Sequence, residues 1–256
     1  MNLIAIDTAT EKFSVALSVE RQERADTWLF EADAGMRHSE LVMDAARMLT
    51  QTAALEPKDI GGVVCMGGPG SFTGLRIGFS IAKGLALSLG VPFAPIPTLD
   101  CLAWPVSSWR GIAVPVLDAK KKAFFCALYR EGRRLGPGMD ATPDVIARVL
   151  AENISPPAPT AAREQVLLFG PGARMLYGEM QSLKAGDPGV SGVTAALRLG
   201  EGVRWGNAET LLEIARELRV FAEGRADSLS ENLFAGPEYI RKSDAELNAL
   251  PKGSVG

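Results

Sequence analysis

Apolar positions in the first half of the chain follow two repeats, one of two residues and one of three to four. Residues 3–6 form a short continuous apolar run, typical of a strand covered on both faces. Residues 13–19 are apolar at every second position, which predicts a second strand. The same patterns predict strands at 25–30, 62–66 and 93–96 and helices at 38–51, 73–89 and 99–104. The first half therefore reads β-β-β-α-β-α-β-α, and short turns make its first three strands antiparallel neighbours.

The second half repeats this opening faintly. In both halves a strand ends in Asp-Ala or Asp-Thr-Ala and a turn leads to another strand, which suggests a duplicated unit. We expect an N-terminal lobe at 1–106 and a smaller, degenerate lobe at 107–241, followed by a disordered tail at 242–256. Within the second lobe the pattern predicts strands at 112–119, 123–129 and 166–169, a helix at 142–153, a loop at 184–194, and a helix at 207–223 that is expected to pack back on the first lobe.

Composition narrows the functional class. The 256 residues are 47% hydrophobic and 22% charged, with a formal net charge of -3. This suits a globular protein and argues against a broadly basic nucleic-acid binder. The chain begins without a basic segment, and its most apolar later stretch is too short for a membrane span. We therefore expect a cytoplasmic protein.

Metal-ligating residues are scarce. His38 is the only histidine, and Cys65, Cys101 and Cys126 are far apart in sequence among mostly apolar neighbours. Zinc sites built from His and Cys are therefore not expected, and we predict no metal ion and no cofactor. The cysteines are expected to be buried thiols of a reducing compartment.

A glycine-rich loop between a predicted strand and a helix is the strongest local feature. Such a loop can bind an anion through backbone N–H groups and the helix dipole. Asp7, at the end of the first strand, is a candidate metal or phosphate contact. The candidate nucleotide or anion residues are Asp7, Gly68, Gly70, Ser71 and Thr73. Both features also fit structural turns. The loop lacks the lysine of a Walker A motif, so tight triphosphate binding is not expected.

Small residues recur at every fourth position of the helix after this loop. Gly74, Gly78, Ala82 and Ala86 form a smooth ridge that another helix can approach closely. Spacing alone leaves open whether the neighbour belongs to this chain or to a partner.

Several motifs together resemble the TsaB (YeaZ) family. They are the strand ending in Asp7-Thr8-Ala9-Thr10, the Arg37-His38-Ser39-Glu40 segment, the Gly68–Gly78 loop and helix start, the Ala82–Ala86 segment, Asp118-Ala119, and Pro237–Arg241. The match is dense over the first ~105 residues and scattered beyond them. The resemblance implies an α/β, actin-like ATPase (ASKHA, ribonuclease H-like) fold with two related lobes.

The resemblance also implies a function. TsaB-like proteins belong to the machinery that places threonylcarbamoyl on adenosine 37 of tRNAs reading codons that begin with A. The expected role is a non-catalytic scaffold or activator, because Thr98 and Leu102 stand where the catalytic relative TsaD has its metal-binding His-x-x-x-His pair. Expected partners are TsaD and the ATPase TsaE, with a homodimer when alone and indirect or weak tRNA contact.

The implied partner surface uses two helices of the first lobe. Its expected residues are His38, Leu41, Val42, Ala45, Leu49, Gly74, Gly78, Ala82 and Ala86. Alternatives remain: a small actin-fold kinase using Asp7 and the glycine loop, a metallopeptidase-like enzyme, or a self-sufficient homodimer with another scaffold role. The metallopeptidase has too few possible ligands, whereas the kinase requires magnesium-dependent ATP binding by the isolated chain.

Overall fold

The computed structural model describes residues 1–22, 24–33, 38–154, 164–183, 188–221 and 236–238. Its first sheet has the strand order β3-β2-β1-β4-β5. β1, β2 and β3 are antiparallel neighbours, whereas β4 and β5 run parallel to β1. The strands are β1 (Asn2–Asp7), β2 (Lys12–Glu20), β3 (Ala25–Asp33), β4 (Ile60–Met66) and β5 (Phe93–Ile96), all as the apolar pattern predicts.

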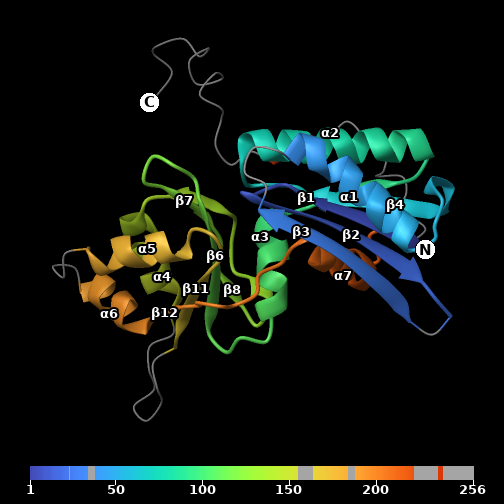
Figure 1. The fold of residues 1–256 in the computed structure, drawn as a ribbon. Helices are drawn as coiled ribbons and strands as arrows, with labels where there is room; N and C mark the ends of the chain where they lie inside the picture. Colours follow the sequence, from blue (N-terminus) through green and yellow to red (C-terminus); the bar gives the residue numbers. More distant parts are fainter. Residues whose placement is uncertain (23, 34–37, 155–163, 184–187, 222–235, 239–256) are drawn as a thin grey trace.

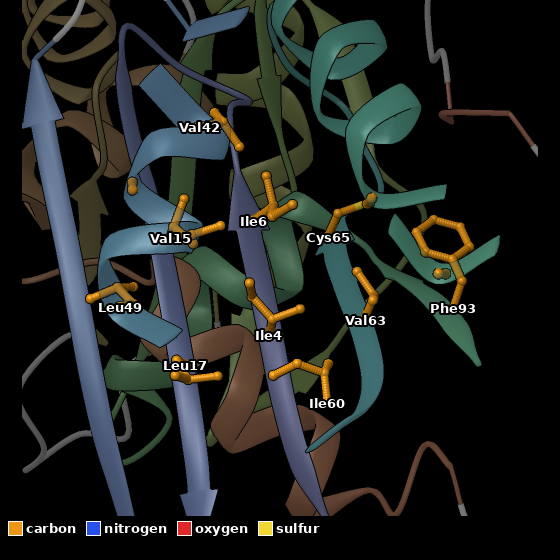
Figure 2. Close-up of a cluster of buried hydrophobic side chains, with 14 of the residues drawn as sticks. Ile4, Ile6, Val15, Leu17, Val42, Leu49, Ile60, Val63, Cys65 and Phe93 are labelled. Atoms are coloured by element: carbon orange, nitrogen blue, oxygen red, sulfur yellow. The ribbon is translucent and has the colours of Figure 1, made fainter. Parts of the chain in front are cut away.

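Both faces of this sheet are covered, which explains its nearly continuous apolar strands. On one face, Ile4 and Ile6 of β1 join alternate residues of β2 and β4 and the helices α1 (His38–Thr52) and α2 (Phe72–Leu89). Figure 2 shows this cluster, with Val42 and Leu49 of α1 above the strands. On the other face, Leu3 and Ala5 pack against α7 (Ala208–Glu217). Figure 1 shows the sheet between these two helical layers.

The second sheet repeats the order of the first. Its path is β10-β7-β6-β11-β12, with β6, β7 and β10 antiparallel neighbours and β11 and β12 parallel to β6. A short pair, β8 and β9, attaches to β6. The strands are β6 (Ile112–Asp118), β7 (Phe124–Cys126), β8 (Tyr129–Arg130), β9 (Arg133–Arg134), β10 (Met139–Ala141), β11 (Val166–Phe169) and β12 (Leu197–Leu199).

Two sheets with one shared order define the architecture. In each, the first strand pairs antiparallel with the second and parallel with the fourth, so the second unit is a topological copy of the first. The fold is therefore the expected actin-like α/β fold with two related lobes. Helices α4 (Pro143–Asn153), α5 (Ala173–Gln181) and α6 (Pro188–Ala196) cover one face of the second sheet.

The lobes exchange helices where they meet. Helix α3 (Thr98–Ala103) follows the first sheet but packs on the second, through Leu99 and Leu102. Helix α7 follows the second sheet but packs on the first. The thiol of Cys101 in α3 donates to the carbonyl oxygen of Asn207, which precedes α7, at 3.6 Å. The two crossing helices thus connect the sheets.

Several expectations about elements need correction. Residues 188–194 belong to α6 rather than to a loop, because Val193 and Ala196 are buried against the second sheet. The pattern also misses α5. The expected strand at 123–129 is divided into β7 and β8, which both pair with β6. The helix expected to reach 223 ends at Glu217, and Arg219 adopts a φ of 47°. The expected disordered tail at 242–256 lies outside the described residues.

Two short segments complete the chain path. Pro57–Asp59 and Trp104–Val106 form single 3-10 turns before β4 and after α3. Over the ranges that the structure describes, no helix combines the length and apolar character needed to cross a membrane. All three cysteines are free and buried.

Candidate functional site

The glycine-rich loop lies where parallel strands end together. β1, β4 and β5 run parallel, so Asp7, Met66 and Ile96 end at one edge of the first sheet. The chain leaves β4 at this edge and enters α2 after Ser71, whose hydroxyl oxygen accepts the N–H of Gly74 at 3.2 Å. A helix N-terminus beside strand ends is the geometry expected of an anion-binding loop.

Much of the hydrogen-bonding capacity of the loop backbone is used within the chain. The N–H of Gly67 donates to the carbonyl oxygen of Ile96 at 2.6 Å, and the N–H of Gly68 donates to the Thr98 hydroxyl at 3.1 Å. The N–H of Ser71 donates to the carbonyl oxygen of Ala9 at 2.8 Å. These three donors stabilise a tight turn and are turned toward the protein. An anion at this loop would have to displace them or use other groups.

The first turn of α2 is held against the end of β1. The Thr8 hydroxyl donates to the carbonyl oxygen of Gly74 at 2.7 Å. A methyl group at Gly74 would collide with the Thr8 carbonyl oxygen, and one at Gly78 with the Thr8 hydroxyl. The absence of side chains at both glycines therefore allows α2 to approach the strand. Thr73 is exposed on the outer side of this turn.

Asp7 is buried at the end of β1. Its Oδ1 accepts the N–H of Ala9 at 2.9 Å, which is an Asx turn that leads toward β2. Burial raises the pKa of Asp7 to about 7, with a smaller rise from the Glu31 carboxylate and an opposing effect of the Ala9 hydrogen bond. This carboxyl group therefore keeps its proton to a higher pH than an ordinary aspartate does.

The second lobe presents a matching turn. Asp118 ends β6 as Asp7 ends β1, and its Oδ1 accepts the N–H of Lys120 at 2.7 Å. A glycine loop after β11 rests on this unit, since Gly172 donates to the carbonyl oxygen of Val116 at 2.9 Å. The hydrogen bond that the Lys120 ammonium donates to the Asp118 carboxylate, together with the charge of that carboxylate, raises the pKa of Lys120, and Glu11 of the first lobe adds to the rise. Glu11, in the turn between β1 and β2, therefore acts electrostatically on a residue of the second-lobe turn.

The glycine loop is also contacted by the distant C-terminal segment, to which the sequence assigns no role. The N–H of Glu238 donates to the carbonyl oxygen of Gly67 at 2.7 Å. Gly68 has a φ of 105°, and a side chain there would collide with the Glu238 carbonyl oxygen. In the sequence, the Pro237–Arg241 motif is the feature that draws attention to this segment. Residues 239–241 of the motif lie outside the described residues.

The positions that correspond to the expected metal-binding pair are part of the core. Thr98 is fully buried, accepts the Gly68 N–H and donates its own N–H to the Gly68 carbonyl oxygen at 2.7 Å. Leu102 is buried between α3 and the second sheet. In the parts of the chain that the structure describes, no group of three His, Cys, Asp or Glu side chains is placed to hold a metal ion.

Spacing leaves open which neighbour the small-residue ridge approaches, and in the structure the ridge faces this chain's own sheet. Gly74, Gly78, Ala82 and Ala86 are buried against the chain's own sheet. The ridge faces inward because Gly74 and Gly78 lie tightly against Thr8, and because Ala82 and Ala86 belong to the buried cluster of Figure 2. The same cluster includes Val42, Ala45 and Leu49 of α1. Leu41 is partly buried against the same cluster. His38 is the first residue of α1, and its side chain lies outside the described set.

The outer faces of the same two helices are exposed. On α1, Met43 and Met48 are accessible, and on α2 the most exposed large apolar residue is Leu87. Arg47 of α1 and Ser80 of α2 are exposed as well. Any partner that docks on these helices in this conformation would meet these side chains rather than the buried ridge.

A family model for tRNA N6-adenosine threonylcarbamoyltransferase (TsaD) matches residues 32–200, more than half of the chain. The chain belongs to this family. Several curated relatives are TsaB proteins, named for tRNA threonylcarbamoyladenosine biosynthesis, so the resemblance to the TsaB (YeaZ) family is confirmed. The Bacillus subtilis protein is 33% identical over 132 residues, and the Escherichia coli protein is 36% identical over 134 residues.

These alignments are partial. Each covers 51% of this chain, and they cover 56% and 55% of the two relatives, so the chain spans little more than half the length of the TsaB proteins it matches. Two solved YeaZ-type structures from Pseudomonas aeruginosa extend the likeness of the fold. One has a TM-score of 0.66 at 24% identity, covering 94% of this chain and 99% of its own, and the other has a TM-score of 0.64 at 23% identity.

Proposed function

We propose that this chain is a non-catalytic subunit of the complex that transfers threonylcarbamoyl to N6 of adenosine 37 in tRNAs reading codons that begin with A. It acts in the cytoplasm as a scaffold and activator of a catalytic TsaD partner, together with the ATPase TsaE. The observation that carries the proposal is the use of Thr98 and Leu102, at the positions of the expected metal ligands, as packing residues of the chain's own core.

The glycine loop supports the same interpretation. A nucleotide-hydrolysing site requires backbone donors directed at the phosphates. Here the N–H groups of Gly67, Gly68 and Ser71 donate inside the protein, and Glu238 lies against the loop. These contacts favour a loop that fixes the position of α2. They give no support to the alternative of an actin-fold kinase.

The exposed outer faces of α1 and α2 are the proposed partner surface. Met43, Met48 and Leu87 place apolar area in water, and exposed apolar patches are typical of protein interaction sites. A catalytic TsaD subunit would cover this surface in the active complex. A second copy of the chain would cover it when the chain is alone, because the same apolar area then lacks its partner. Contact with tRNA is indirect or weak.

A reconstitution assay tests the proposal. The chain, TsaD and TsaE are combined with threonylcarbamoyl-adenylate and unmodified tRNA, and modified adenosine is measured after omitting each protein in turn. We expect product from the complete mixture, little without this chain, and none from this chain alone. Product from this chain without TsaD, or undiminished product without this chain, would overturn the proposed role. Thr98→Ala, which keeps position 98 free of metal ligands, should leave any activity of a correctly folded subunit intact.

A further inference from the structure

The segment Pro237–Glu238 contacts the glycine loop through its backbone. The N–H of Glu238 donates to the carbonyl oxygen of Gly67 at 2.7 Å. The carbonyl oxygen of Glu238 lies where a side chain on Gly68 would begin. Both contacts use main-chain atoms, and the Glu238 residue as a whole is exposed. The contact therefore depends on the path of the segment more than on the side chain of Glu238.

Two other places on the loop and the start of α2 are filled in the same way. A side chain on Gly70 would collide with the carbonyl oxygen of Ala9, and one on Gly74 with that of Thr8. These two carbonyl groups belong to the turn between β1 and β2, whereas the one at Gly68 comes from a segment far along the chain. Carbonyl oxygens are hydrogen-bond acceptors. A surface that faces three of them is suited to receive a peptide backbone and unsuited to an anion.

Gly68 is held by two partners. Its N–H donates to the Thr98 hydroxyl at 3.1 Å, and its carbonyl oxygen accepts the N–H of Thr98 at 2.7 Å. The Glu238 backbone packs against the same residue. Gly68 comes shortly before Ser71, whose hydroxyl oxygen caps α2. A segment that fixes Gly68 therefore also fixes the path of the chain into α2.

The sequence favours an extended segment that docks and releases. Pro237 fixes its own φ and disfavours a helical conformation at Gly236, so less conformational freedom is lost when the segment docks. Proline has no N–H, and the hydrogen bond uses the N–H of the next residue. One backbone hydrogen bond changes a docking equilibrium by only about fivefold. The segment can therefore leave the loop without unfolding the lobe.

We propose that Pro237–Glu238 is a detachable strap on the glycine loop. When docked, the strap holds the loop and the first turn of α2 in place, and its release loosens both. This gives a role to the part of the Pro237–Arg241 motif that the structure describes. TsaD and tRNA take no part in the strap, so the proposal is tested on the isolated chain and stands or fails separately from the proposed function.

Hydrogen exchange of single amides tests the strap. Glu238→Pro removes the donating N–H and leaves the full chain intact. Glu238→Ala is the matched control, because it keeps the N–H and removes only the side chain of an exposed residue. Exchange is measured by NMR at Gly68 and Thr98. The N–H of Gly172, which donates to the carbonyl oxygen of Val116 in the second lobe, reports on the stability of the rest of the chain.

We expect the amides of Gly68 and Thr98 to exchange about fivefold faster in Glu238→Pro than in wild type. Their exchange in Glu238→Ala should be unchanged, and exchange at Gly172 should be the same in all three chains. Equal exchange at Gly68 and Thr98 in the two variants would overturn the proposal. Equal acceleration at Gly172 in Glu238→Pro would overturn it as well, because the segment would then stabilise the whole chain rather than the loop.

Gly68→Ala tests the same contact from the side of the loop. Because Gly68 has a φ of 105°, an added side chain is strained there whether the strap is docked or released, but it collides with the Glu238 carbonyl oxygen only when the strap is docked. The fall in the urea midpoint caused by Gly68→Ala should therefore be larger in the wild-type background than in the Glu238→Pro background. Equal falls would mean that the two positions act independently and would overturn the proposal.

Discussion

At the scale of single residues, Asp7 shows how position changes chemistry. The same type of Asx turn ends β1 and β6, yet the pKa values of the two aspartates are shifted in opposite directions. Burial raises the pKa of Asp7 to about 7. At Asp118, desolvation also acts upward, but hydrogen bonds from Lys120 and its charge outweigh it and lower the pKa. The Asp-Thr-Ala and Asp-Ala motifs indicate both turns, whereas the deeper burial of Asp7 relative to Asp118 is set by the three-dimensional packing.

The first prediction concerns the pH dependence of stability. Unfolding returns the pKa of Asp7 from about 7 to about 3.8, so the folded state binds the proton more tightly. The stabilisation of the folded state by this proton is fully present below pH 4, declines as pH rises to 7, and is lost above pH 7. It amounts to at most about 4 kcal/mol. Asp7→Asn should keep the Ala9 hydrogen bond and be more stable than wild type at pH 8, with the difference vanishing near pH 4.

Urea unfolding at pH 4, 6 and 8 measures this difference. Asp118→Asn is the matched control, because its pKa is lowered and its contribution is instead lost as pH falls. Parallel stability profiles of wild type and Asp7→Asn between pH 4 and pH 8 would contradict the raised pKa.

The second prediction distinguishes core from partner surface on α2. Ala82 is fully buried, whereas Ser80 of the same helix is exposed. Ala82→Leu adds volume to a closed cluster and should lower the free energy of unfolding by about 1–3 kcal/mol. Ser80→Leu should change it by less than about 0.5 kcal/mol. Chemical denaturation compares the two. An Ala82→Leu chain as stable as the Ser80→Leu chain would restore the ridge as an outer surface.

At the scale of elements, periodicity identifies the first lobe well because its strands and helices are long. Both faces of the first sheet are buried, and α1 and α2 each present one apolar stripe. The second lobe is harder to predict. Pro188, Gly189, Ser191 and Gly192 disfavour a helix at α6, which forms because residues further along it are buried. Strands of two or three residues, such as β9 and β12, are too short for periodicity to show.

The third prediction concerns the start of α7, the element that joins the lobes. The Asn207 side chain accepts the N–H of Glu209 at 3.0 Å, and its amide donates to Glu31 at 2.9 Å. Asn207→Ala should therefore lower stability by about 1–2 kcal/mol. Thr142 precedes α4 without a side-chain cap, so Thr142→Ala should cost less. Thermal melts would reveal the difference, and equal losses would argue against the cap.

At the scale of the whole molecule, the duplicated order of strands positions the site. The carboxyl ends of β1 and β4 meet the glycine loop, and the equivalent ends of β6 and β11 meet its counterpart. The faint Asp-containing repeat predicts this duplication. Sequence spacing also predicts that α2 carries a small-residue ridge. It could not show the direction of that ridge, which depends on where Thr8 lies in three dimensions.

The fourth prediction follows from the exposed outer faces of α1 and α2. Met48→Glu with Leu87→Glu places charge on the proposed partner surface and should weaken association with TsaD at least tenfold without unfolding the chain. Met175→Glu, at an exposed residue of α5 in the second lobe, should have no effect. Analytical ultracentrifugation of the mixtures measures the association. Equal affinity of all three chains would place the partner elsewhere.

The proposed function is tested most directly by the threonylcarbamoyladenosine content of cellular tRNA. Cells in which this chain is depleted are compared with cells that carry it, and nucleosides from purified tRNA are quantified by mass spectrometry. We predict a loss of most threonylcarbamoyladenosine on depletion, and its recovery when the wild-type chain is restored but not when the Met48→Glu, Leu87→Glu chain is supplied. An unchanged content in depleted cells would contradict the account.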